Sequence, residues 1–300
     1  MHPAELAILL HRALEVRLAR FQERVSADGW TQGGEPLHQA RVAARRLVAV
    51  LDLVDPEAYP GHKSRRRTLK TLVDALGLGR ELDVHALWLH ARRERAGDPA
   101  DQAVLEHLLD RLGRMRLKTR RAMAGELEPL DLEGLPRLLK VPALPEPFQA
   151  LSLQAAAWGC LEPRVEAALA ALPGLLAAED VAALHRTRVR VKKLRYALEA
   201  LDEAFAPPPA ALLEALKAFQ AELGAHHDLA LLEGWLEAEG RRLREAALPT
   251  LAGRTEALLA EVAEARRQAF ARVLQSATPL GAAAAARTLH SALGLSEGAP

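Results

Sequence analysis

Two stretches of the chain each carry a histidine followed by arginine and lysine residues at helical spacing. The first reads HQARVAARRL from His38, and the second reads HRTRVRVKKLR from His185. At about 100° per residue, His38, Arg41 and Arg45 share one side of a helix, and the second stretch repeats this pattern. No acidic residue occurs within residues 36–51 or 181–198, so carboxylates do not neutralise these faces. Guanidinium, ammonium and imidazole groups gathered in this way suit the binding of phosphate oxygens.

The two stretches belong to a duplication that spans most of the chain. LHQARVAARRLVAVLDLVD aligns with LHRTRVRVKKLRYALEALD at an offset of 147 residues, and the same offset pairs Trp88 with Trp235. Similarity at one fixed offset indicates a repeated structural unit. Because two copies nearly fill the 300 residues, we expect two related units whose basic faces meet at a shared seam.

Helices are expected to position these faces. Ala, Leu, Glu and Arg, which favour helices, dominate the composition, and no alternating strand pattern occurs. We expect an all-α fold of two tandem four-helix bundles, related by a pseudo-two-fold axis, with a basic central pore or groove. Proline and glycine punctuation predicts helices at residues 4–26, 37–54, 62–95 (kinked near Gly77 and Gly79), 100–127, 148–172, 182–205, 210–246, 251–275 and 281–293.

The composition and the positions of proline and glycine also predict the domain boundaries and the cellular compartment. We assign the first bundle to 1–128, a proline-rich linker to 129–147, the second bundle to 148–276, and a C-terminal helix and tail to 277–300. The net charge is only +1, and no apolar run is long enough for a membrane span. A single cysteine, Cys160, excludes a CxxC metal site. The N-terminus lacks a signal-peptide pattern, so we expect a cytoplasmic protein.

The sequence resembles the CHAD domain, a conserved histidine α-helical domain. The family pattern H-x-x-R-V-x-x-[RK]-[RK]-[LM]-R is approached by both basic stretches, and its LG-x-x-[RN]-D turn by LGLGRELDV and LGAHHDLAL. The first copy departs at Val48 and Glu81, and Val48 removes one anion contact from that half. The resemblance implies paired four-helix bundles that bind inorganic polyphosphate in a central basic pore without catalysis. It implies no metal or cofactor, and it suggests association with polyphosphate granules.

Carried over position by position, the resemblance implies a set of polyphosphate-binding side chains. These are His38, Arg41, Arg45, Arg46, Lys70, His185, Arg188, Lys192, Lys193, Arg195 and Lys217. Further candidates rest on the repeat offset, which pairs Arg17 with Arg164, Arg80 with His227, and Arg120 with Arg267.

Parts of the sequence are also compatible with two other functions, a metal-dependent phosphohydrolase and a nucleic-acid-binding or scaffold protein. His226, His227 and Asp228 could belong to an HD-type metal phosphohydrolase, but His227 aligns with Arg80, and an arginine does not ligate a metal. A nucleic-acid-binding or scaffold protein is a third possibility, since nucleic acid is also a phosphate polymer. Aromatic residues for base stacking are scarce, and only Tyr196 lies beside a basic face, so nucleic acid is the less favoured partner.

Overall fold

The computed structural model describes residues 4–25, 34–54, 56, 61–77, 79–130, 134, 152–170, 172–175, 179–277, 280 and 282–295. Every regular element among these residues is a helix, which confirms the predicted all-α class. In chain order the elements are α1 (Ala4–Val25), α2 (Gly34–Leu51), α3 (His62–Ala75), α4 (Arg80–Arg93), α5 (Pro99–Leu127), α7 (Leu153–Leu169), α8 (Leu172–Leu175), α9 (Val181–Ala200), the 3-10 turn η2 (Asp202–Ala204), α10 (Ala210–Glu245), α11 (Pro249–Ala277) and α12 (Ala282–Ala292).

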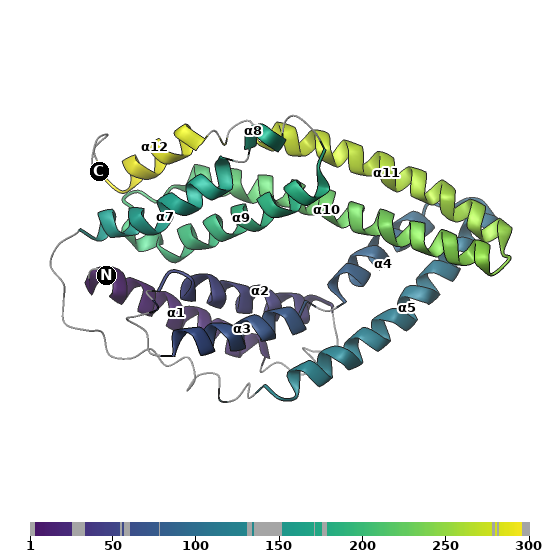
Figure 1. The fold of residues 1–300 in the computed structure, drawn as a ribbon, viewed down its shortest axis with the longest axis horizontal. Coiled ribbons are helices and arrows are strands. Elements are labelled where there is room, and N and C mark those ends of the chain that lie inside the picture. Colours follow the sequence, from purple (N-terminus) through teal and green to yellow (C-terminus); the bar gives the residue numbers. More distant parts are fainter. Residues whose placement is uncertain are drawn as a thin grey trace.

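The helices form an elongated molecule with a thick body and a narrower distal lobe (Figure 1). In the body, α1, α2 and α3 lie below α7, α9 and α12. The long helices α10 and α11 run side by side from the body to the far end of the distal lobe, where α4 and α5 accompany them. None of the helices among the described residues is long and apolar enough to cross a membrane.

Two hydrophobic cores correspond to these two parts. The core of the body combines residues of both repeats, for example Leu47 of α2 and Leu194 of α9. The core of the distal lobe also combines both, for example Leu105 of α5 and Leu236 of α10. Burial of apolar surface therefore joins the two repeats in each core instead of giving each repeat a core of its own. The predicted linker at 129–147 lies mostly outside the described residues.

Local sequence signals explain where several helices begin. Asp98 and Asp180 cap α5 and α9, because their side chains accept hydrogen bonds from backbone N–H groups of the first turn. The predicted helix at 62–95 is two helices, α3 and α4, separated around Gly79, whose φ of 79° suits glycine. A Cβ atom at Gly79 would also lie 3.1 Å from Cγ2 of Thr119 in α5. In the second repeat, α10 continues through the equivalent region without a break.

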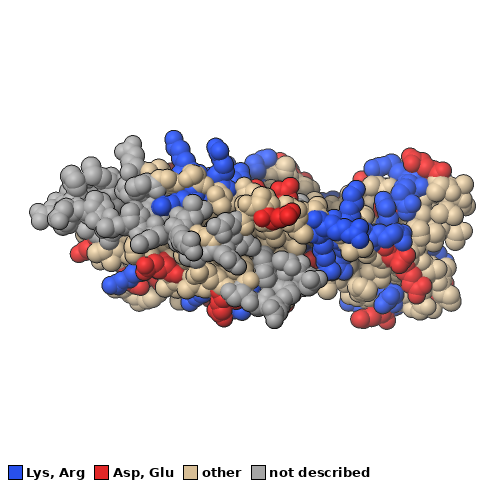
Figure 2. Space-filling view, turned by 90° about the horizontal axis from the view of Figure 1, so that it is seen from below, with Lys and Arg blue, Asp and Glu red and all other residues tan. Residues whose placement is uncertain are grey.

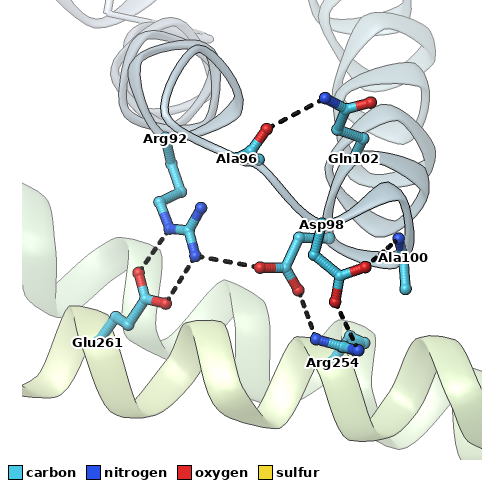
Figure 3. Close-up of polar contacts among 8 residues, drawn as sticks. Arg92, Ala96, Asp98, Ala100, Gln102, Arg254 and Glu261 are labelled. Atoms are coloured by element: carbon cyan, nitrogen blue, oxygen red, sulfur yellow. Dashed lines mark hydrogen bonds and ion pairs between the residues drawn. The ribbon is translucent and has the colours of Figure 1, made fainter.

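Ion pairs hold the tip of the distal lobe together (Figure 3). Arg92 of α4 pairs with Glu261 of α11 at 2.7 Å and with Asp101 of α5 at 3.4 Å. Arg254 of α11 pairs with Asp98 and Asp101, each at 2.8 Å. Each arginine of this distal network therefore has two carboxylate partners that lie on other helices or at their caps.

Candidate functional site

The two predicted basic faces meet in the interior, between α2 of the first repeat and α9 of the second. Arg41 of α2 is close enough to Arg188 of α9 for their charges to interact, and Lys192 of α9 interacts with both Arg41 and Arg45. Side chains of α4 and α10 complete the group. We call it the central cluster, and it consists of His38, Arg41, Arg45, Arg80, His185, Arg188, Lys192, His227 and Asp228.

Burial and mutual repulsion weaken the hold of the central cations on their protons. Burial, reinforced by the charges of its arginine neighbours, lowers the pKa of Arg41 to about 10, and this side chain is only 7% exposed. Burial and the charges of Arg45 and Arg188 lower the pKa of Lys192 to about 7. The cluster is thus a concentration of positive charge inside the protein, where low dielectric strengthens its field.

The histidines of the cluster are neutral at physiological pH. Burial lowers the pKa of His38 and of His185, and the neighbouring cations lower both further. Burial and the adjacent His185 ring lower the pKa of His227 to about 4, and the two ring centroids are 4.5 Å apart. A neutral ring still presents one N–H donor, so these residues can add hydrogen bonds without adding charge.

No carboxylate of the described residues forms an ion pair with the four central cations, although Asp228 lies close enough to Arg41 for their charges to interact. Within the described chain, no Asp or Glu oxygen lies within 4 Å of Arg41, Arg45, Arg188 or Lys192. Asp228 is the one acid of the cluster, and burial raises its pKa. The Nε atoms of Arg41 and Arg188 are buried without a hydrogen-bond partner among the described residues. Unpaired buried donors cost about 1–3 kcal/mol each, so the cluster is suited to an anion that accepts several hydrogen bonds.

Close packing brings α10 against the cluster. A Cβ atom at Gly224 of α10 would lie 3.6 Å from Nε of Arg188, an ordinary contact distance, so this part of α10 packs directly beside the guanidinium. Gly224 belongs to the LG turn motif of the second repeat, and Arg80, His227 and Asp228 follow that motif in their respective copies. The motif therefore supplies part of the site from α4 and α10. Asp228, which was not among the predicted binding residues, could have been found by this signal.

Other predicted residues lie outside the cluster, and several of them have carboxylate partners. Arg46 and Arg195 both approach Glu199, at 3.4 Å and 2.9 Å, and both lie over the ring of Tyr196. Lys217 is exposed and pairs with Glu214, and Arg267 is exposed and pairs with Glu264. Lys70 is exposed on α3, Arg120 is half-buried on α5, and Lys193 is exposed and lines a separate pocket.

Arg17 and Arg164 join the two repeats at equivalent positions. Arg17 of α1 donates to the backbone carbonyl of Glu199 in α9 at 2.6 Å. Arg164 of α7 donates to the backbone carbonyl of Asp52, just after α2, at 2.9 Å. Each arginine thus satisfies a carbonyl at the end of the basic helix of the other repeat, where intrahelical partners are missing. Both side chains have a clear structural role.

The residues that suggested a metal enzyme are divided between two environments. His226 is fully buried, and its Nε2 lies 2.8 Å from Oε1 of Glu179, whereas His227 faces His185 in the central cluster. No three His, Cys, Asp or Glu side chains in the described part of the chain are placed to hold a metal ion.

Cations on the outer surface differ from those at the centre. Seen from below, lysine and arginine side chains gather where the body meets the distal lobe, with acidic side chains among and around them (Figure 2). On α5, for example, Arg114 pairs with Asp110 at 2.8 Å and Arg116 pairs with Asp83 at 2.6 Å. Asp83, which belongs to the turn motif of the first repeat, thereby anchors a basic side chain.

An all-helical fold that brings two copies of a basic, histidine-headed helix together defines the class of protein. The chain belongs to the CHAD domain family, whose model matches residues 12–237. The structure is similar to the crystal structure of the CHAD domain from the plant Ricinus communis, with a TM-score of 0.62 and 25% sequence identity over 95% of this chain and 92% of that one.

A second solved structure, PptA from Streptomyces chartreusis, has the same fold. The TM-score is 0.67, the identity is 20%, and the match covers 92% of this chain and 99% of that one. No curated protein matches the chain.

Proposed function

We propose that the central cluster binds inorganic polyphosphate, a linear chain of phosphate groups, and that it does so without catalysis. The observation that carries this proposal is the absence of carboxylate partners in the described chain for Arg41, which is buried, and for Arg45, Arg188 and Lys192, which are half-buried. A structural role for such charges requires compensation, as burying a charge without a partner is costly. A polyanion offers compensation to all of them together.

The chemistry of the cluster matches phosphate better than other anions. Arginine forks donate paired hydrogen bonds to phosphate oxygens, and Lys192 adds a compact charge between them. The two repeats contribute equivalent hydrogen-bond donors from α2 and α9. This arrangement suits a ligand in which the same phosphate group is repeated along a chain. Membership in the CHAD family supports the same ligand class.

A titration tests the proposal. The full chain is titrated with long-chain polyphosphate, tripolyphosphate, and single- and double-stranded DNA, at about 50 mM and about 200 mM NaCl. Polyphosphate should bind most tightly, with affinity rising with chain length and falling as salt rises, since each phosphate contact displaces counterions. DNA bound as tightly as polyphosphate would contradict the proposal in favour of a general nucleic-acid binder. Hydrolysis of a phosphate ester that depends on an added divalent metal would contradict the non-catalytic part.

The proposed ligand also suggests where the protein is located in the cell. We propose that the protein is cytoplasmic and associates with polyphosphate granules, because granules present many ligand chains to each binding site. A fluorescently tagged chain should coincide with polyphosphate-stained granules in cells and become diffuse when Arg41 and Arg188 are both replaced by alanine. Granule association that survives this double substitution would assign the targeting to another surface.

A further inference from the structure

Beyond the central cluster, the same side of α2 leads to a separate pocket. Ala49 lies about one turn after Arg45, or about 5.4 Å along the helix, and Asp52 directly follows the last residue of α2. Both residues line a pocket of about 500 Å³ between α2, α3, α7 and α9. We call it the flank pocket, and its cations are Arg66, Arg164, Arg190 and Lys193.

The charges of the flank pocket are only partly compensated. Arg66 pairs with Asp52 at 2.5 Å, and Arg164 donates to the carbonyl of the same residue. Arg190 and Lys193 are exposed, and no carboxylate of the described residues lies within 4 Å of either. Four cations therefore share one acid in a concave site. Lys193 directly follows Lys192 of the central cluster in α9, but its side chain leaves the helix about 100° away and lines the flank pocket.

The equivalent end of the other repeat is built differently. Tyr196 and Glu199 occupy the positions of Ala49 and Asp52, 147 residues later. The buried Tyr196 ring lies under Arg195 and Arg46, and Glu199 pairs with both. The pocket on that side is lined by three acids, Glu199, Asp202 and Glu203, as well as five cations, and two of those cations, Arg12 and Arg46, pair with Glu203 and Glu199. Both ends have a pocket, but the flank pocket has the small Ala49 and one acid where the other end has the large Tyr196 and three acids.

From this asymmetry we infer that the flank pocket is a second phosphate-binding site, next to the central cluster and separate from it. This inference rests on the proposed function. Its ligand is a run of phosphate groups, with Arg190 and Lys193 as the contacts that have no partner within the protein. The phosphates come either from the part of a long polyphosphate chain that extends past Arg45 or from a separate short phosphate compound.

Isothermal titration with tripolyphosphate, which is short, counts the two sites. The wild type should bind two equivalents. The Arg190→Gln/Lys193→Gln variant should lose the weaker equivalent, and Arg41→Gln/Arg188→Gln should lose the stronger one. The matched control is Arg12→Gln/Arg20→Gln, which removes two exposed charges from the equivalent pocket of the other repeat and should keep both equivalents.

Long-chain polyphosphate identifies the source of the phosphates. If the polyphosphate chain itself fills the flank pocket, Arg190→Gln/Lys193→Gln should weaken long-chain binding about 5- to 20-fold. The slope of log affinity against log salt concentration should also decrease by the amount expected for about two phosphate contacts. If a separate compound fills it, long-chain affinity stays unchanged and tripolyphosphate still binds to the polyphosphate-saturated protein.

The outcomes separate this inference from the proposed function. A single tripolyphosphate equivalent in the wild type, lost only in the central variant, overturns the flank site and leaves polyphosphate binding intact. A second equivalent that Arg190→Gln/Lys193→Gln does not affect also overturns it. Absence of any phosphate binding by the wild type overturns the proposed function first.

Discussion

Arginines of the central cluster and arginines of the distal network occupy opposite electrostatic environments. Arg92 and Arg254 at the tip of the distal lobe each contact two carboxylates, whereas Arg41 and Arg188 contact none in the described chain. The first pair joins helices, and its charges are satisfied in the free protein. The second pair is brought together by the packing of α2 and α9 and repels. Compensation by carboxylates thus distinguishes the distal arginines from the central ones.

The sharpest test of this difference removes both central arginines. Arg41→Ala with Arg188→Ala should weaken long-chain polyphosphate binding by at least about 100-fold, since each charge-assisted contact contributes about 1.5–3 kcal/mol. Calorimetric titration measures the loss, and circular dichroism measures the helical content, which should stay unchanged. Unfolding of the double variant would show instead that the central arginines hold the fold.

A second test removes the lysine with the most perturbed pKa. Lys192→Met should weaken polyphosphate binding about tenfold, the equivalent of one charge-assisted contact. The free variant should be as stable as the wild type or roughly 1–2 kcal/mol more stable at pH 7, because a buried charge without a partner is removed. Urea denaturation measures the second effect, and a clear loss of stability would contradict it.

The same lysine predicts how binding depends on pH. The pKa of Lys192 is about 7 in the free protein, and a bound polyanion favours the protonated form, so binding should take up a proton near pH 7–8. Affinity should fall as the pH rises from 7 to 9. In the free protein the lowered pKa means that the unfolded chain binds more protons between about pH 7 and 10, so stability should rise with pH over that window. Lys192→Met should lose both dependences.

The smallest effect is expected at the distal network. Arg254→Ala removes two ion pairs from a side chain that is 41% exposed, so the free energy of unfolding should fall by only about 0.5–1 kcal/mol. Polyphosphate affinity should stay within about twofold of the wild type, because the network joins α4, α5 and α11 at the tip of the distal lobe, whereas α2 and α9, which carry the central arginines, lie in the body (Figure 1). A binding defect comparable to that of the central variants would remove the distinction between the two regions.

Helical periodicity predicted the helices and the residues at the seam. His38, Arg41 and Arg45 lie on one face in the sequence pattern and together in the structure. The pattern did not separate Arg46 and Lys193, which lie about a quarter turn away and enter other environments. The family motif includes Arg46 and Lys193 on the same terms as the central cations, because it carries no information about which acidic side chains lie nearby.

Packing between the repeats could not be predicted from local patterns. The apolar stripe of each helix shows which side is buried but not which helix covers it. The expectation of tandem bundles therefore did not predict that each hydrophobic core contains residues of both repeats. The alignment of the two repeats shows which residues differ at equivalent positions, but it does not show the structural effect of each difference. Ala49 and Tyr196 became informative only when the two ends of the seam could be compared.

The reciprocal contacts of Arg17 and Arg164 make the chain equivalent to a homodimer whose subunits have been covalently joined. Each repeat lends an arginine to the other and receives one in return. A polypeptide with one copy of the repeat could complete this exchange only by pairing with a second copy, so the geometry is that of an isologous interface. Tethering the partners fixes their stoichiometry and frees each copy to diverge. The difference between the end at Ala49, with one acid in its pocket, and the end at Tyr196, with three, gives the molecule a direction.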